Sequence, residues 1–266
     1  MTVAAVSSCL AILESLASER EPIKLAEIAD RLNMPDKAVH RLVTTLVNQG
    51  WVIHDIISQN YALSLRMSTL AFRNLDACNL YDVVQNVLNR VARDTRECCR
   101  LSILKDQNLV LLARAQGATN GLRYDPDMGQ ETALHATASG KAWLATLPDE
   151  EALAIVHSRG LGAPSKLGPN SAHCLEEVRL RLAETRQRGF ATSVEEAEAG
   201  TAAIAVPFRA SDAFDAPVAG TISVAGPLIR VTPDRWPELV AVLSGAATEL
   251  CQIWPSRARA RSLGSI

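Results

Sequence analysis

Apolar residues in the first fifty positions recur at steps of three and four, which is the spacing of amphipathic helices. The first run spans residues 3–17 and places on one face Val3, Val6, Leu10, Leu13, Leu16 and Ala17. A shorter run follows Pro22 and has the apolar positions Leu25, Ile28, Ala29 and Leu32. A third helix is predicted from Pro35 to residue 48 or 49, with an inward face of Val39, Leu42, Val43 and Leu46. Two short helices joined by about three residues predict a helix-turn-helix.

The pattern changes to that of β-strands after the third helix. Residues 51–54 and 60–63 are two β-prone runs, separated by a polar turn through Ser58 and Gln59. A hairpin at this place predicts a winged helix, in which the third helix enters the major groove of DNA and the hairpin reaches the phosphates or the minor groove. The predicted DNA contacts are Lys37, His40, Arg41, Thr44, Thr45, Ser58 and Gln59. Lys37 is expected to meet a phosphate, and His40 or Arg41 a purine edge.

The charge of the chain limits how it can bind DNA. The 266 residues include 27 Lys plus Arg and 29 Asp plus Glu, and residues 1–75 carry seven basic and seven acidic side chains. This balance excludes a protein that coats nucleic acid through bulk positive charge. A neutral unit binds DNA weakly as a single copy, so we expect a homodimer or tetramer on a pseudo-palindromic operator. The alternative is a winged helix that contacts a protein partner.

Beyond residue 64 the pattern predicts a helical linker and then a mixed α+β domain. Helical segments cover residues 65–80 and 83–91, with a break near Cys78 and Asn79. The predicted strands are 100–105, 109–115, 202–208 and 218–224, and the predicted helices are 136–147, 150–156, 175–188 and 235–253. A loop rich in Gly, Pro and Ser spans residues 158–171. This order of elements predicts an antiparallel sheet covered by helices.

The chain resembles the IclR family of bacterial transcriptional regulators over nearly its whole length. In the first half the matching stretches are residues 25–29, 39–46, 50–52 and 61–63. More specific are the stretches of the second half: 135–142 (HATASGKA), 188–190, Glu195-Glu196, Gly200, 205–207 and 222–227 (ISVAGP). Many members carry Ser or Thr where this chain has Lys37-Ala38, so operator contacts cannot be transferred there. The resemblance implies a GAF-like effector-binding domain and a linker that helps to pair subunits.

These observations predict four segments. Residues 1–64 form the winged helix-turn-helix DNA-binding domain, 65–80 the helical linker, 81–255 the GAF-like domain and 256–266 a flexible tail with Arg257, Arg259 and Arg261.

The stretch 135–142 superficially resembles a phosphate-binding loop. However, His135 stands where such a loop needs its first glycine, and alanine follows Lys141, so a nucleoside triphosphate site is not expected. Small residues at a helix start still let backbone N–H groups approach an anion. The resemblance implies an effector pocket here, lined by Ala138, Ser139, Ser193, Thr201, Ala203, Ser223 and Ala225.

Two of these positions bear on the size of the effector. Family members that bind very small keto acids commonly place Asp and Cys where this chain has Ser193 and Ala203. Both changes shrink the side chain or remove charge. The resemblance therefore leads to the hypothesis of a bulkier organic acid, aromatic or a lactone-type relative.

Enzymatic and metal-binding motifs are not evident in the sequence. The five histidines form no zinc-protease motif, and there is no Gly-x-Ser-x-Gly elbow. Cys98 or Cys99 with a distant histidine is the remaining catalytic alternative, and His173-Cys174 beside His157 the remaining metal alternative. The six cysteines are scattered, the apolar stretches are too short to cross a bilayer, and the N-terminus lacks an export signal. We therefore predict a cytoplasmic protein that is not an enzyme and needs no metal or cofactor.

The sequence as a whole predicts a ligand-responsive, DNA-binding transcriptional regulator. Repression of a catabolic operon is favoured over activation, with a small organic acid, aromatic under the hypothesis above, as the effector. The competing interpretation is a GAF-like metabolite-binding or protein-interaction module whose winged helix does not bind DNA.

Overall fold

The computed structural model describes residues 3–76, 80–105, 107–124, 133–162, 167–213 and 216–254. The chain divides into two compact units, Met1–Ala77 and Cys78–Ile266. The predicted break near Cys78 and Asn79 and the predicted tail 256–266 lie outside the described residues. Each unit is described by itself below.

The first unit is a winged helix-turn-helix. Its helices are α1 (Ala4–Ala17), α2 (Leu25–Leu32), α3 (Asp36–Asn48) and α4 (Arg66–Asp76), and its strands are β1 (Ile23–Lys24), β2 (Val52–Asp55) and β3 (Asn60–Leu63). The three strands form an antiparallel sheet in the order β1-β3-β2. The predicted helices and the β2–β3 hairpin are confirmed. The two-residue strand β1 was not predicted, because so short a segment shows no period.

The turn between α2 and α3 depends on one left-handed residue. Asn33 ends α2 with φ +50°, a backbone conformation that asparagine tolerates better than most residues. The N–H of Met34 bonds to the carbonyl of Ala29, which closes the turn. At the far end of α3, Gly50 has φ +72° and starts the chain into β2. These two residues set the path of the chain before and after α3.

The predicted apolar face of α1 is wrong in its first half and at Ala17, which is exposed. Val3, Val6 and Leu10 are exposed, by 66%, 57% and 54%. The residues of α1 that are buried are Ile12, Leu13 and Leu16. They pack with Ile28, Val39, Val43, Leu46 and Val52 in the core of this unit. The N-terminal turns of α1 extend beyond this core, so their apolar side chains meet solvent in the single chain.

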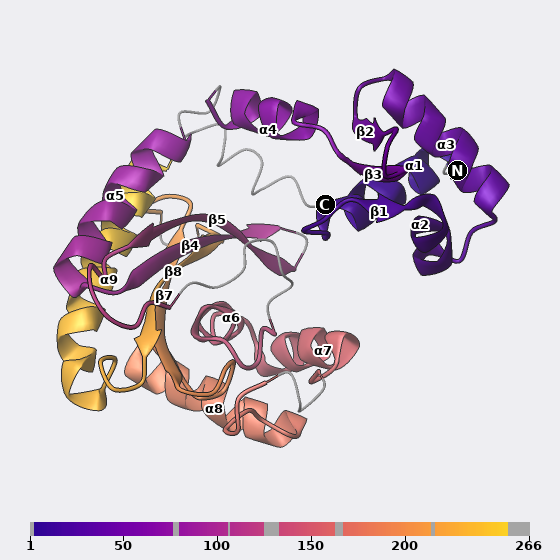
Figure 1. Cartoon of the computed structure of the whole chain (residues 1–266). Helices are drawn as coiled ribbons and strands as arrows, with labels where there is room; N and C mark the ends of the chain where they lie inside the picture. The colour runs from indigo at the N-terminus through magenta and orange to yellow at the C-terminus, as the bar shows by residue number, and fades with distance from the viewer. Residues whose placement is uncertain are drawn as a thin grey trace. The chain divides into compact units, whose positions relative to one another are not determined.

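The second unit is built on one antiparallel sheet of five strands in the order β5-β4-β8-β7-β6 (Figure 1). The strands are β4 (Cys98–Lys105), β5 (Asn108–Gln116), β6 (Ala191–Val194), β7 (Thr201–Arg209) and β8 (Val218–Pro227). Helix α5 (Leu80–Thr95) precedes the sheet, α6 (Ala138–Leu144), α7 (Asp149–Arg159) and α8 (Leu175–Arg188) are inserted between β5 and β6, and α9 (Trp236–Ile253) follows β8. The predicted α+β architecture is confirmed.

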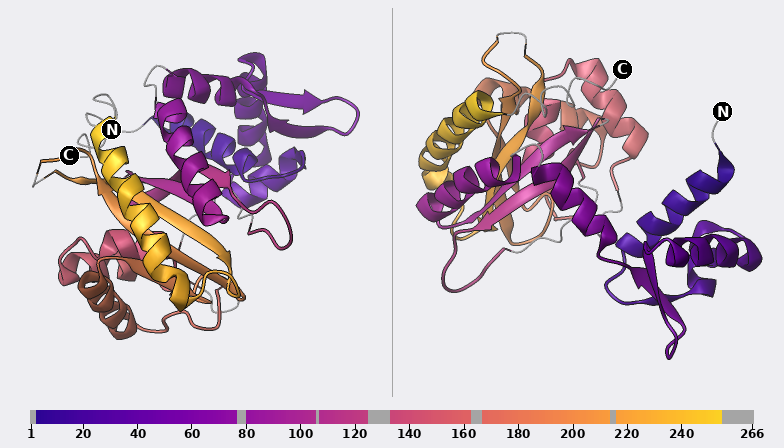
Figure 2. Two further views of the ribbon diagram at one scale, coloured as in Figure 1. Left: turned by 90° about the vertical axis from the view of Figure 1, so that its left-hand side faces the viewer. Right: turned by 90° about the horizontal axis from the view of Figure 1, so that it is seen from above.

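The two faces of this sheet are covered differently. Helices α5 and α9 lie side by side across one face (Figures 1 and 2), where large side chains such as Leu88, Ile204, Ile222 and Leu243 form the main core. Helix α6 packs on the opposite face, against β6, β7 and β8. That contact consists of small residues: Ala138, Ala142, Ala191, Ala203, Ala205 and Ala225, with Tyr124 beside them. We call this second surface the effector face, because the predicted effector residues Ser193, Ala203, Ser223 and Ala225 belong to it.

Several predicted boundaries in the second unit need correction. The predicted helix 136–147 is shorter, because Thr137 caps α6 with a side chain that accepts the N–H of Gly140. Helix α7 extends to Arg159, into the predicted loop 158–171. Strand β6 was missed, because its run of four residues carries two hydroxyl side chains and no strong apolar alternation. It pairs with β7 at the sheet edge.

A buried carboxylate links two junctions of the second unit, the one between α5 and β4 and the one between β8 and α9. Glu97, between α5 and β4, is 1% exposed and accepts Nε and Nη2 of Arg230 at 2.7 and 2.8 Å. Arg235 lies 3.6 Å from the same carboxylate and also bonds to the carbonyl oxygens of Thr95 and Arg230. Gly226 is required beside it, since a Cβ there would lie 2.3 Å from Oε2 of Glu97. The pair fixes the α5–β4 junction to the β8–α9 junction.

We expect Glu97→Gln to lower the free energy of unfolding of the second unit by about 3–5 kcal/mol, because breaking one half of a buried pair leaves the other charge uncompensated. Urea unfolding can be followed by tryptophan fluorescence, since Trp143, Trp236 and Trp254 lie in this unit. Glu176→Gln is the matched control, because it removes an exposed carboxylate that pairs with Arg179. Equal unfolding midpoints for the two variants would contradict the structural role of Glu97.

Candidate functional site

The exposed face of α3 carries the predicted DNA contacts of this helix. Lys37, His40, Arg41, Thr44 and Thr45 are all exposed, whereas Val39, Val43 and Leu46 on the other side are buried. The apolar side of α3 therefore packs into the core and leaves one polar surface free. Within the described part of the chain, neither Lys37 nor Arg41 makes an ion pair, so both cations are available to an external partner.

The two threonines of this face have an internal bond each. The hydroxyl of Thr44 donates to the carbonyl of His40 at 2.7 Å, and that of Thr45 to the carbonyl of Arg41 at 3.0 Å. These bonds hold the side chains in one rotamer along the helix and leave the hydroxyl lone pairs and methyl groups outward.

The tip of the wing is organised by Asp55. Its carboxylate accepts the hydroxyl of Ser58 at 2.7 Å and the N–H of Ile57 at 2.9 Å, and these bonds lower the pKa of Asp55. Gln59, with φ +58°, donates its side-chain amide to the carbonyl of Ile56. Ser58 and Gln59 are exposed, as a contact with DNA requires. Their polar groups also form hydrogen bonds within the turn. Their contact with DNA stays a prediction.

On the effector face, strand register brings predicted residues together. Ser193 pairs with Ala203 and Ala203 with Ala225 across β6, β7 and β8, so these three residues form one row on one side of the sheet. Ala138 of α6 packs against this row in the small-residue cluster, and Ser139 beside it is buried. Thr201 lies at the start of β7, where its hydroxyl donates to the carbonyl of Glu198 at 2.9 Å.

The serines of this face differ in their bonding. Ser193 donates to the carbonyl of Ala136 at 2.7 Å and so ties β6 to the segment before α6. Ser223 is fully buried, yet its Oγ has no hydrogen-bond partner among the described residues. Thr221, two positions earlier on β8, is in the same condition within the described segments. Buried hydroxyls without partners are uncommon and mark the place where a ligand could bond.

The start of α6 offers less to an anion than the sequence pattern suggested. The helix has seven residues, and the N–H of Gly140 is already bonded to Thr137. Lys141 is buried and directs its Nζ to both carboxylate oxygens of Glu196, at 2.5 Å each. Arg181 of α8 pairs with the same carboxylate. Lys141 is thus an internal ion-pair residue that anchors α6, in agreement with the absence of a phosphate-loop pattern.

His135 lies buried next to this ion-pair group. Burial, followed by the charges of Lys141 and Arg181, lowers the pKa of His135 below its ordinary value of 6.5. Its Nε2 has no hydrogen-bond partner within the described residues. The neutral imidazole is therefore the form that the folded state prefers.

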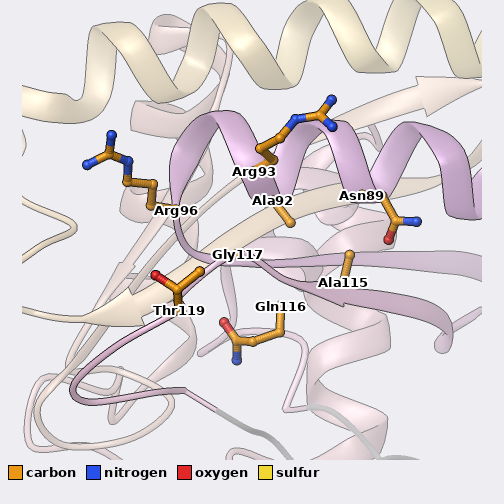
Figure 3. A pocket seen from close by; sticks show the side chains of 8 residues that line it. All are labelled: Asn89, Ala92, Arg93, Arg96, Ala115, Gln116, Gly117 and Thr119. Carbon is orange, nitrogen blue, oxygen red and sulfur yellow. The ribbon is translucent and has the colours of Figure 1, made fainter.

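Neither of two clefts at the surface of the second unit is lined by a predicted effector residue. One, of about 400 Å³, opens between α5 and β5 and includes Asn89, Arg93, Arg96, Gln116 and Thr119 (Figure 3). Arg93 and Arg96 extend in different directions in this view, so their charges do not converge on one point. The other, of about 480 Å³, lies near Phe208 and Cys251.

The residues that sequence analysis missed are Arg100, Thr221 and Tyr124. Arg100 and Thr221 lie on the effector face next to Ser223, and Tyr124 packs on the same face. The available signal was Arg100 itself, a charged residue inside an otherwise apolar strand.

Two observations bear on the catalytic alternative at Cys99 and on the metal alternative. Burial raises the pKa of the Cys99 thiol, which opposes formation of a thiolate. Among the described residues, no group of three His, Cys, Asp or Glu side chains is placed to hold a metal ion. A search of the described helices finds none that is long and apolar enough to span a membrane.

The winged helix-turn-helix and the separate α+β unit together define a DNA-binding transcriptional regulator, and comparison with known proteins gives the family. Residues 5–55 match the IclR helix-turn-helix domain, and residues 72–252 match the C-terminal domain of the bacterial transcriptional regulator IclR. The chain belongs to the IclR family.

Individual relatives agree with this assignment. The HTH-type transcriptional regulator KdgR of Dickeya chrysanthemi is 31% identical over 255 residues, which cover 94% of this chain and 79% of the relative. The transcriptional repressor IclR of Escherichia coli (strain K12) is 29% identical, over 91% of this chain and 86% of the relative.

Solved structures show the same fold. An IclR-type transcriptional regulator from Alicyclobacillus acidocaldarius is 25% identical with a TM-score of 0.80, covering 98% of this chain and 100% of its own. An IclR homologue from Microbacterium hydrocarbonoxydans, solved in complex with 4-hydroxybenzoate, is 24% identical with a TM-score of 0.75, covering 93% and 98%.

We expect the difference between Ser193 and Ser223 to appear in stability. Ser193→Ala should lower the free energy of unfolding by about 1–3 kcal/mol, because the buried carbonyl of Ala136 loses its donor. Ser223→Ala should leave the stability unchanged or raise it, because it removes a buried hydroxyl without a partner in the described structure. Thermal or urea unfolding of both variants measures this, and a larger loss for Ser223→Ala would contradict the assignment.

The neutral state of His135 predicts a pH dependence. Between the lowered pKa of folded His135 and the ordinary value of 6.5, the unfolded chain binds the additional proton, so stability falls as the pH falls through this window. His135→Gln should flatten that part of the curve of unfolding free energy against pH. Identical curves for wild type and His135→Gln would rule out the contribution of this residue.

Proposed function

We propose that this protein represses a catabolic operon and is released from its operator by a small organic acid. The observation that carries this proposal is the exposed polar surface of α3 on a winged helix, where Lys37 and Arg41 form no ion pair with a described residue. The second unit adds buried hydroxyl groups that have no hydrogen-bond partner in the described structure. The relatives named repressors support the sign of regulation. The complex of the Microbacterium homologue with 4-hydroxybenzoate supports an aromatic acid as effector.

On DNA, α3 lies in the major groove. Lys37 meets a phosphate, Arg41 or His40 a purine edge, and Thr44 and Thr45 complete the surface. The wing places Ser58 and Gln59 at the phosphates or in the minor groove. Residues 1–64 form the DNA-binding domain, with 65–80 as the linker to the effector domain 81–255.

The working protein is a homodimer or tetramer on a pseudo-palindromic operator. Two observations support pairing. Residues 1–75 are neutral in charge, so a single copy gains little from phosphate attraction. It also exposes an apolar row on α1, Val3, Val6 and Leu10, which a second copy could cover.

The effector binds on the effector face, against Ala138, Ser139, Ser193, Thr201, Ala203, Ser223 and Ala225. A ligand that binds the two DNA-binding arrangements with different affinity shifts their populations, and a coupling of about 1–3 kcal/mol changes operator binding roughly 5- to 150-fold. The protein acts in the cytoplasm, is not an enzyme and requires no cofactor or metal.

Arg41→Ala should weaken binding to the operator about 5- to 150-fold, because one base contact contributes roughly 1–3 kcal/mol of discrimination. Binding to the DNA upstream of its own gene is measured by gel shift at several salt concentrations. Circular dichroism should show an unchanged fold, since Arg41 is exposed. Lys105→Ala, an exposed change in the second unit, is the control and should bind normally. A gel shift of Arg41→Ala equal to that of wild type, or wild-type binding that does not depend on DNA sequence, would favour the protein-interaction alternative.

A further inference from the structure

One row of the effector face contains Arg100 beside Ser223. Ala191 pairs with Ala205, Ala205 with Ser223 and Ser223 with Arg100, so these residues lie side by side across β6, β7, β8 and β4. Register partners in antiparallel strands have Cβ atoms about 4.5–5.5 Å apart. Arg100 is therefore the neighbour of Ser223 on the same face, and it brings a positive charge next to the buried hydroxyl.

Arg100 has a fixed position but lacks a hydrogen-bonded anion. Its side chain is half-buried, and its guanidinium lies over the ring of Tyr124, 5.3 Å from the centroid. Its Nε is buried without a hydrogen-bond partner, and none of the described carboxylates forms an ion pair with it. Tyr124 holds the guanidinium through this cation–π contact and leaves Nε without a hydrogen-bond partner among the described residues.

Other charges act on this place. Arg114, the register partner of Arg100 on β5, lies on the same face, but it has an interaction of its own. The exposed Glu198 acts electrostatically on Tyr124. Arg100 is thus a cation next to Ser223 that forms no ion pair with a described carboxylate.

Another arginine of the same unit, Arg230, shows how Nε and a terminal nitrogen bind a carboxylate. Arg230 uses Nε and Nη2 to hold both oxygens of Glu97, at 2.7 and 2.8 Å. This side-on, bidentate geometry is the strong form of an arginine–carboxylate bond. Arg100 lies on the effector face, and its Nε makes no such bond within the described residues.

The neighbouring groups define the rest of the ligand. Oγ of Ser223 and Oγ1 of Thr221 are buried and have no partners in the part of the chain that is described. Each hydroxyl can both donate to and accept from an oxygen function. Ala203, Ala205 and Ala225 present only methyl groups beside them, which suits an apolar ligand body.

We propose that Arg100 binds the carboxylate of the effector through Nε and one terminal nitrogen, with Tyr124 as a positioning residue. The effector is then a monocarboxylate with an apolar body and a second oxygen function, hydroxyl or carbonyl, that bonds to Ser223. This inference rests on the proposed function and specifies its ligand.

The test measures binding of three carboxylates, 4-hydroxybenzoate, pyruvate and glyoxylate, to the full chain by calorimetry. The neutral amide 4-hydroxybenzamide is measured beside them. For the best carboxylate, Arg100→Gln should weaken binding roughly 10- to 150-fold, as expected for lost hydrogen bonds to a charged group. Arg100→Lys keeps the charge but loses the Nε edge, so its affinity should fall between wild type and Arg100→Gln. Wild type should prefer the acid over the amide, and Arg100→Gln should lose that preference.

Two controls separate binding from structure. Arg96→Gln changes an arginine at the cleft between α5 and β5 and should leave carboxylate affinity unchanged. Without ligand, Arg100→Gln should unfold at the same temperature as wild type or higher, because it removes a charge that has no counter-ion in the described structure. A lower unfolding temperature for Arg100→Gln, together with equal affinities for the acid, would assign Arg100 a structural role and overturn the proposal.

The remaining outcomes are also decisive. If no carboxylate of the panel binds, or if acid and amide bind equally well to wild type, the carboxylate assignment is wrong. Gel shifts distinguish this from failure of the proposed function. If Arg100→Gln and wild type bind operator DNA equally and are released equally by a ligand, the regulator function stands and the role of Arg100 falls. If wild type shows no sequence-dependent DNA binding, the proposed function itself fails.

Discussion

The central strand β8 is the constraint on which the second unit depends. It is buried at every position except its two ends, so its side chains must pack on both faces of the sheet, alternating from one face to the other. Ile222 and Val224 face α5 and α9 and complete the large-residue core. Thr221, Ser223 and Ala225 face the other way, toward the side that α6 covers. Because side chains alternate along a strand, a shift of one residue would bury the hydroxyls in the apolar core and turn the core residues toward the effector face.

Two buried carboxylates hold the helices that frame this sheet. Glu97 joins the segments that flank the α5–α9 side, and Glu196 holds α6 through Lys141 and α8 through Arg181. Both carboxylates form ion pairs with cationic side chains of the protein. Arg100 differs, because it is held by an aromatic ring and has no described carboxylate partner. The unit therefore separates charges that maintain the fold from one that is free to respond to a ligand.

The helices and the wing were predictable because their apolar periods are long and their ends carry clear signals such as Asn33 and Gly50. The first half of α1 was misjudged, since period alone cannot tell a core face from a face that a single chain leaves open. Pairing with β7 sets strand β6, and the Thr137 cap sets the start of α6. Neither contact is reported by periodicity. Alternation along the strands does not place Arg100 beside Ser223 unless the register of β4 against β8 is known. That register brings together residues more than one hundred positions apart in the sequence.

The bonds made by the two threonines of α3 restrict what this helix can recognise. A hydroxyl has one hydrogen to donate, and Thr44 and Thr45 already give theirs to the carbonyl oxygens of His40 and Arg41. In this rotamer they offer a base pair only lone pairs and methyl groups. The amino groups of adenine and cytosine and the methyl group of thymine match these features, whereas the acceptor edge of guanine does not. In the proposed complex with DNA, recognition of guanine by this helix would therefore fall to its cationic side chains.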